Sequence, residues 1–436
     1  MSPATGRIRT LTAVPAWFLL PGLGVFLASL AAYVQYQRYF PASGLDLGIY
    51  RQAVQAFFAG RQVYDLTFTL GLPYTYPPVT LPLLAPLVRL DDAGALHVLM
   101  GLSVLATFLT IWFTWGLVGY RGVAGRLGVT GAVTGLALWL EPVGMNLGLG
   151  QVNAVLMLLV VADLALPDRN RCKGVGIGVA AACKLVPGIF VVYLLLTRRF
   201  RAAAVAAGTF LAMALAGWVV APRESTSFWL HALFLDPSRV SAATSPAFVA
   251  NQSLRGVALR TLGETTGATV FWVVSALLVA GAGLVLAVLA HRQGEEAIAV
   301  VTVAFTALLV SPVSWSHHWV WVAVLLPLLL DVVLRMRGRA QVVAAGLLPM
   351  WVMMLVTWPL LPRPEDPLSA NGIIWVAHRH GQPVHWLGEN MYVPAALGTM
   401  LLAAWWLRTN RDGSMMPATN SYQRQKVGEL VTTGYQ

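Results

Sequence analysis

The sequence predicts an all-α polytopic membrane protein. Of its 436 residues, 57% are hydrophobic and only 11% are charged, and the mean hydropathy is +0.69. Soluble domains are about 25% charged and about 45–50% apolar. Because a spanning helix needs about 20 apolar residues, this content allows roughly ten to thirteen spans with modest loops and leaves no room for a large soluble domain.

The first apolar run covers residues 14–33 and follows Arg7 and Arg9. The run is too long for the core of a signal peptide, and no small-residue cleavage site follows it. We therefore expect a retained first span with a cytoplasmic amino terminus. Further spans are expected at residues 95–118, 123–140, 152–166, 202–221, 269–290, 298–310, 319–334, 341–361 and 393–407.

Residues 174–197 form an apolar stretch with a basic cluster at each end, so a single crossing would leave one cluster on the wrong side. Each half of the stretch has about ten residues and would form about 15 Å of helix, which is half a bilayer. We therefore expect two short helices that enter the membrane and return, with Lys184, Val186 and Pro187 near the break. Such breaks are tolerated only where they line a cavity or lie within protein. Counting the pair as two gives about twelve membrane segments.

The charges set the expected orientation. Lys and Arg outnumber Asp and Glu by 29 to 18, a net charge of +11, and most basic residues fall at edges assigned to the cytoplasm. Residues 1–408 then form a single membrane domain, with outer loops at 35–76, 141–151, 222–267 and 362–392. A polar, flexible cytoplasmic tail is expected at 409–436. The proline-rich residues 76–90 are expected to pack within the outer half of the membrane.

The first outer loop contains the sequence LDLGIYRQAVQAFF, which predicts a short amphipathic helix on the outer membrane surface. Its polar face carries Arg51, Gln52 and Gln55. Its apolar set is Leu47, Tyr50, Val54, Phe57 and Phe58. Asp46 lies at or just before the first turn, which leaves two interpretations open. Its carboxylate either caps the backbone of the helix or acts as a general base toward an incoming hydroxyl group.

Lys184 is the second candidate for chemistry. An ammonium group inside an apolar span costs several kcal/mol unless it finds a partner or water, and an anionic phosphate is such a partner. Three amides, Asn146, Gln151 and Asn153, lie at the outer end of another span. Hydrogen bonds between helices are the competing interpretation for these amides.

Two adjacent histidines, His317 and His318, follow Trp315 at the outer membrane boundary. Neighbouring residues on a helix point about 100° apart, so at most one histidine is expected to face a shared site. The sequence has no HExxH or Cys-His set, and we expect no metal there. The outer loops add further candidates that are compatible with phosphate: His231, Asp236, Arg239, Asn251, Gln252, Arg255, Arg260, His378, Arg379, His380, His385 and Glu389.

Five motifs occur in a characteristic order: DLGIY from Asp46, YTYPP from Tyr74, GQVN from Gly150, CKLVPG from Cys183 and SPVSWSHHW from Ser311. In this order they resemble the polyprenyl-phosphate-mannose-dependent mannosyltransferases of the GT-C superfamily in actinobacteria, which are glycosyltransferase family 87-like. The resemblance extends from Asp46 to about Trp321. It implies a GT-C fold in the plasma membrane, with an active site on the extracytoplasmic side.

The resemblance also implies a reaction: inverting α-1,2-mannosyl transfer from polyprenyl-phospho-mannose to a mannosylated phosphatidylinositol. The catalytic carboxylate maps onto Asp46, and Lys184 and Arg255 are assigned to the donor phosphate. We assign sugar binding to His317, His318, Gln151, Asn146, Tyr50, Tyr76 and Trp315. No cofactor, metal or nucleic acid is expected.

Two alternatives remain open. A related mannosyltransferase that branches lipomannan or lipoarabinomannan would show similar motifs. A secondary transporter would also have about twelve segments and a broken helix, but such proteins place ionisable residues at mid-membrane in repeated halves. Here Lys184 is the only good candidate within a span.

Overall fold

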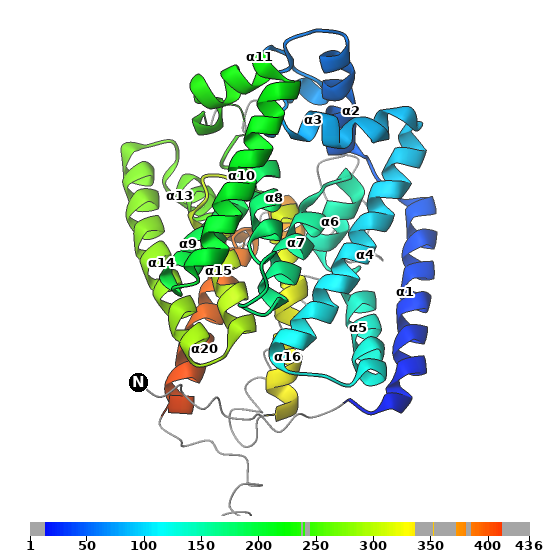
Figure 1. Ribbon diagram of the computed structural model, residues 1–436, viewed down its shortest axis with the longest axis vertical. Coiled ribbons are helices and arrows are strands. Elements are labelled where there is room, and N and C mark those ends of the chain that lie inside the picture. Colours follow the sequence, from blue (N-terminus) through cyan, green and yellow to red (C-terminus); the bar gives the residue numbers. More distant parts are fainter. Residues whose placement is uncertain are drawn as a thin grey trace, which may run out of the picture.

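The computed structural model describes residues 14–236, 239, 245–335, 352, 372–380 and 385–411. Over these residues the chain folds into a bundle of helices joined by short turns (Figure 1). The expected span at 341–361 and most of the expected tail lie outside the described residues. The all-α class is confirmed.

The long helices of the described chain are α1 (Leu19–Tyr39), α4 (Asp92–Val118), α10 (Phe200–Val220) and α14 (Thr266–Arg292). With residues Ser316–Val333, these make five helical segments among the described residues that are long and apolar enough to cross a membrane. A bent pair would add a sixth. A membrane protein is thus confirmed, and the count of about twelve segments stays a prediction.

Several expected spans are short helices: α5 (Val123–Ala137), α7 (Asn153–Ala165) and α15 (Glu296–Val310). Helix α15 is buried along almost its whole length, and it packs against α14, α16 (Val322–Arg335) and α20 (Tyr392–Arg411). A helix that is apolar on all sides suits such a central position. Its sequence therefore reads as a span although protein, and not lipid, surrounds it.

Helices α1 and α5 approach each other closely along a stripe of glycines. A side chain at Gly22 of α1 would overlap the carbonyl group of Gly128 of α5, and one at Gly125 would overlap that of Val14, just before α1. Small residues allow such close contact between membrane helices. This contact holds the first helix of the chain against the bundle.

Most of the expected outer loop at 141–151 is not a loop, because residues Glu141–Leu149 form the buried helix α6. The chain bends by 118° between α6 and α7. Gly150 makes the turn with a φ of +70°, in the left-handed region that favours glycine. Gln151 and Asn153, which follow Gly150, therefore lie at the bend between α6 and α7.

The expected pair of short helices between the basic clusters is present, while its entry into the membrane stays a prediction. Helix α8 (Val175–Cys183) ends where Lys184 becomes extended, and α9 (Ile189–Leu196) begins after the turn Val186–Gly188. The residues just before α8 and just after α9 lie close together. Lys173 Nζ lies 2.8 Å from Asp168 Oδ1, and the Arg201 guanidinium donates to the Asp168 carbonyl. The chain therefore turns back at Lys184.

Helices α2 (Leu45–Phe58), α3 (Thr80–Leu84) and α11 (Pro222–Ser225) lie together at one end of the bundle (Figure 1). The expected helix in the first outer loop is thus present. Its expected faces need correction, since Arg51 is buried and Phe58 is 67% exposed. Arg51 donates to the carbonyl groups of Leu87 and Asp91, because the loop after α2 folds back over that face.

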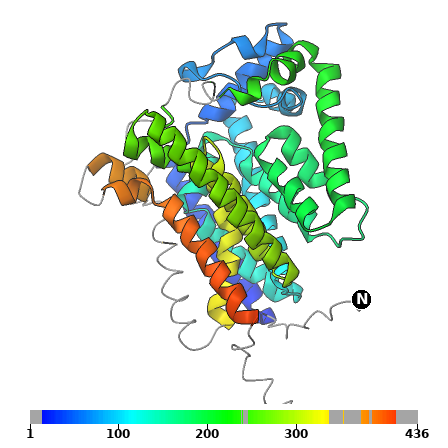
Figure 2. The ribbon, with the colours of Figure 1, turned by 90° about the vertical axis from the view of Figure 1, so that its left-hand side faces the viewer.

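Helices α13 (Leu254–Leu262), α18 (Ile373–His380) and α19 (His385–Glu389) complete this end. Figure 2 shows α18 and α19 beside the α13 end of α14. The Gln252 amide donates to the Glu389 carbonyl at 2.6 Å, and the Arg260 guanidinium donates to Asn390 Oδ1 at 2.9 Å. These bonds attach the last outer segment to the bundle.

Candidate active site

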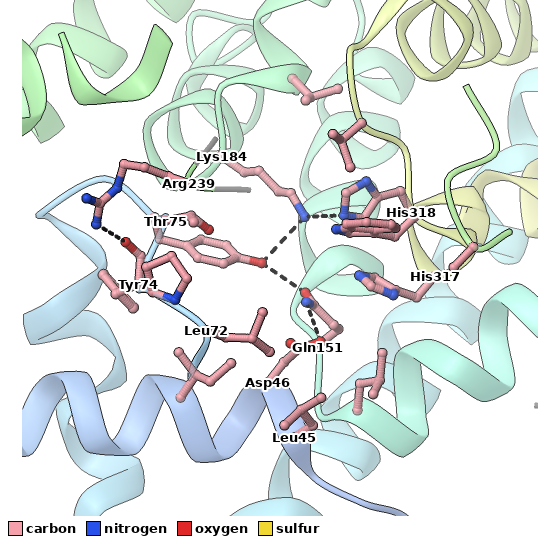
Figure 3. A pocket seen from close by; sticks show the side chains of 18 of the residues that line it. Leu45, Asp46, Leu72, Tyr74, Thr75, Gln151, Lys184, Arg239, His317 and His318 are labelled. Atoms are coloured by element: carbon pink, nitrogen blue, oxygen red, sulfur yellow. Dashed lines mark hydrogen bonds between the residues drawn. The ribbon is translucent and has the colours of Figure 1, made fainter. Parts of the chain in front are cut away.

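A cavity of about 380 Å³ is lined by residues of α2 and by residues at the ends of α6 and α8. This volume is within the range of about 300–1,000 Å³ that is typical of small-molecule sites. Its polar lining comes from elements far apart in the sequence (Figure 3). The polar and aromatic lining residues include Asp46, Tyr50, Tyr74, Tyr76, Gln151, Lys184, Arg239, Trp315, His317, His318 and Trp375.

Asp46 projects from the first turn of α2 into the cavity. The residue at the N-cap is Gly44, and no side chain caps this helix, so the capping interpretation of Asp46 is wrong. Instead Asp46 Oδ2 accepts a hydrogen bond of 2.8 Å from Gln151 Nε2. Burial raises the pKa of the Asp46 carboxyl to about 6, while the Gln151 bond and the Lys184 charge act in the opposite direction. A carboxyl with this pKa is ionised at neutral pH and still basic enough to take a proton.

Gln151 is the first member of a hydrogen-bonded chain that continues through Tyr76 and Tyr50. Its Oε1 accepts from the Tyr76 hydroxyl at 2.9 Å, and the Tyr76 oxygen accepts from the Tyr50 hydroxyl at 2.8 Å. Burial raises the pKa of the Tyr76 hydroxyl above its usual value, so this group stays a neutral donor. The orientation of the Asp46 carboxylate is therefore fixed by a chain of neutral groups.

Lys184 contacts the same chain of hydrogen bonds at Tyr76, on the side away from Asp46. Its Nζ donates to Asn153 Oδ1 at 2.8 Å, lies 3.4 Å from the Tyr76 hydroxyl and lies 3.1 Å from His318 Nε2. A charged ammonium can only donate, so His318 accepts through Nε2 and carries its own proton on Nδ1. Asp46 and Lys184 are thus joined through Gln151 and Tyr76 (Figure 3).

Both histidines line the cavity, which corrects the expectation that at most one faces a shared site. Their rings are nearly perpendicular, with centroids 4.7 Å apart and an interplanar angle of 87°. They lie at the start of a 3-10 helix, Ser316–Trp321, that follows an extended segment, so regular α-helical geometry does not apply. His317 Nε2 is buried without a hydrogen-bond partner.

Of the expected site residues, Asn146 and Arg255 do not line the cavity. Asn146 is buried in α6 with no partner for its amide. The Arg255 guanidinium lies on α13, 5.4 Å over the ring of Trp272. The other eight, from Asp46 to His318, are brought together around the cavity.

Three lining or supporting residues were not assigned to the site from the sequence. Asn153 accepts a hydrogen bond from Lys184, although in the sequence it is only one of three amides at the end of an expected span. Arg239 donates to the Tyr64 carbonyl at 2.8 Å. It also donates to the Tyr74 carbonyl at 3.5 Å, on the side opposite the histidines (Figure 3). Trp375 closes the cavity from α18, and its indole donates to Glu141 Oε1 at 2.8 Å. No local pattern marks Trp375, since its position depends on the last outer segment.

Chemically, the cavity places a carboxylate opposite an ammonium and two imidazoles. The carboxylate can accept a proton, and the cation can stabilise an anionic phosphate oxygen. An acid–base arrangement of this kind in a cavity of a membrane protein defines a candidate enzyme active site.

Comparison with known proteins defines the family. Residues 74–312 match the model of glycosyltransferase family 87. The chain is 33% identical over 374 residues to a polyprenol-phosphate-mannose-dependent alpha-(1-2)-phosphatidylinositol mannoside mannosyltransferase of Mycobacterium tuberculosis, covering 81% of this chain and 84% of the relative. It is 32% identical to the protein of the same name in Mycolicibacterium smegmatis, covering 78% and 81%.

A third relative, from another strain of M. tuberculosis, is named as a phosphatidylinositol pentamannoside mannosyltransferase; it is 30% identical and covers 92% of this chain and 90% of its own. The chain belongs to glycosyltransferase family 87 and is therefore an enzyme. The resemblance seen in the motifs is confirmed, and the transporter alternative is set aside.

Proposed function

We propose that this enzyme transfers mannose from polyprenyl-phospho-mannose to a phosphatidylinositol mannoside, forming an α-1,2 linkage with inversion on the outer face of the plasma membrane. The names of its relatives support the donor, the linkage and the class of acceptor. The observation that carries the mechanism is the pairing of Asp46 and Lys184 around one cavity.

In the proposed reaction, Asp46 takes the proton of the acceptor hydroxyl as that oxygen attacks the anomeric carbon of mannose. The new bond joins the acceptor oxygen to this carbon, and the bond from the carbon to the phosphate oxygen breaks. The electron pair of the broken bond leaves with polyprenyl phosphate. A single displacement of this kind turns a β-linked donor into an α-linked product and needs one base.

The leaving group explains why one carboxylate is enough. Glycosidases with inverting geometry use a second carboxylic acid to protonate a poor leaving oxygen. A phosphate is already a good leaving group, and the growing charge on its oxygen needs a cation instead. In the proposal Lys184 supplies this cation, and its contacts with His318 and Asn153 at the cavity support the assignment.

The apolar rim of the cavity suits a lipid-linked donor. Val186 and Phe234 line the cavity and are 37% and 40% exposed. A smaller apolar pocket continues past Lys184 between Pro187, Phe190 and Trp321. We propose that the phosphate binds at Lys184 and that the polyprenyl chain leaves the site along this side of the break.

The direct test supplies the purified enzyme in lipid with labelled polyprenyl-phospho-mannose and a panel of acceptors. The panel contains phosphatidylinositol mannosides with increasing numbers of mannose units and lipomannan precursors. Transfer to one phosphatidylinositol mannoside, with an α-1,2 linkage shown by linkage-specific mannosidase digestion, is the expected result. Transfer only to lipomannan precursors would favour the branching alternative, and no transfer from this donor would overturn the proposal.

A further inference from the structure

Three metal-ligating side chains converge on the outer segment, away from the cavity that contains Asp46. His378 Nδ1 of α18 lies 2.5 Å from Glu389 Oε1 of α19, and His385 Nε2 lies 3.1 Å from the same oxygen. One ligand atom from each side chain lies within 4.8 Å of the other two. None of the three lines the cavity.

We propose that His378, His385 and Glu389 form a binding site for a divalent transition metal ion, with zinc as the best match. Two imidazole nitrogens and one carboxylate oxygen are ligands that zinc accepts in tetrahedral sites. The side chains of His378 and His385 are 49% and 34% exposed, so water can complete the coordination. This proposal does not depend on the proposed function.

The three groups converge on one point, the Oε1 oxygen of Glu389. Both imidazoles approach the same oxygen of Glu389, and the two rings face each other with centroids 6.4 Å apart and an interplanar angle of 28°. Without a metal ion, each imidazole would need a proton on the nitrogen that faces Glu389, since a carboxylate can only accept hydrogen bonds. A metal ion would take one lone pair from each of the three groups in place of those protons, with the ligand atoms moving apart to their metal-bound spacing.

The backbone on both sides of the site is already held in place. His385 and Glu389 are four residues apart on α19 and therefore share a face. The Glu389 carbonyl accepts the Gln252 amide, and Arg260 binds the neighbouring Asn390. On α18, Trp375 is bound to Glu141 one turn before His378. A bound ion would thus join α18 to α19 and support the cavity wall that Trp375 forms.

The test titrates zinc chloride into the purified enzyme, prepared without a polyhistidine tag and treated with chelator. Calorimetry should find one zinc ion per chain, and zinc should raise the melting temperature. Cobalt(II) should give the visible absorption bands of a tetrahedral site with nitrogen and oxygen ligands. Absence of stoichiometric binding to the wild-type enzyme would overturn the proposal.

The variants separate this site from other zinc contacts. His385→Ala and the conservative Glu389→Gln should each weaken zinc binding by about tenfold or more, while both remain monodisperse. Exposed His231 provides the matched control, and His231→Ala should bind zinc like the wild type. Unchanged affinity in the double variant H378A/H385A would show that zinc binds elsewhere and would also overturn the proposal.

Discussion

Asp46 is the residue on which the proposed chemistry depends most. An asparagine keeps the shape of this side chain but cannot accept the proton of the acceptor, so Asp46→Asn should reduce mannosyl transfer by about 10²–10⁴-fold. The matched control is Asp65→Asn, since Asp65 is an exposed acid of the same outer region. Transfer by both variants is measured in membranes with equal protein levels. Near-normal turnover of the Asp46 variant would remove it as the base.

The pKa of Asp46 predicts the acid limb of the pH profile. A base works only when ionised, so kcat/KM should fall as the pH drops through about 6. The Gln151 hydrogen bond stabilises the ionised carboxylate. Gln151→Leu should therefore raise the pKa and move the acid limb to higher pH. An acid limb that does not move would leave Gln151 with only a structural role.

Two cations assigned to the donor phosphate from the sequence occupy different places in the structure. Lys184 faces the cavity, whereas Arg255 lies over Trp272 on α13. Lys184→Gln should therefore raise the KM for the polyprenyl-phosphate donor and lower kcat, while Arg255→Gln should leave both close to the wild-type values. Steady-state kinetics against donor concentration separates the two. Equal losses in both variants would contradict the assignment of the phosphate to Lys184.

At the scale of elements, the turn between α6 and α7 positions the site. Gly150→Ala forces a side chain into a left-handed conformation, which costs about 1–2 kcal/mol, and its Cβ would lie 2.7 Å from the Leu47 Cβ of α2. We expect a lower melting temperature and weaker transfer, because Leu47 is next to Asp46 and Gln151 follows the glycine.

Gly148→Ala is the control for this turn. Gly148 is within α6 and has no atom within 4 Å of the added Cβ, so alanine should be neutral or stabilising by about 0.4–1 kcal/mol. If the two alanine variants melt at the same temperature, the turn does not need glycine.

The elements also show what the sequence could and could not predict. Lys184 was predicted because a charge inside an apolar span is expensive. Asp46 was predicted because a carboxylate begins the helix of the first outer loop and matches the family motif. The choice among Asn146, Gln151 and Asn153 depended on the bend at Gly150, after which Gln151 lines the cavity and Asn153 binds Lys184. The burial of Arg51 depended on the loop after α2 folding back over it. Long-range packing of this kind leaves no periodic signal in the sequence.

At the scale of the whole molecule, the hydropathy pattern predicted a helical membrane protein correctly. It did not separate helices that face lipid from helices that protein surrounds, because α15 is as apolar as a true span. The charge pattern performed better at the broken pair. Basic residues at both ends predicted a return to the same side, and the contacts of Asp168 with Lys173 and Arg201 place those ends together.

The orientation of the molecule in the membrane is the last prediction, and a native cysteine can report it. Cys172 is exposed beside Lys173, at the end of the helix pair assigned to the cytoplasm, while Cys183 is buried. In intact cells, an impermeant maleimide should not label Cys172 until the membrane is permeabilised. Asp65→Cys, after α2, should be labelled from outside in a Cys172→Ser background. This pattern would place the Asp46 cavity on the outer face, where the proposed acceptor and donor meet; the reverse pattern would put the cavity in the cytoplasm and require a cytoplasmic acceptor.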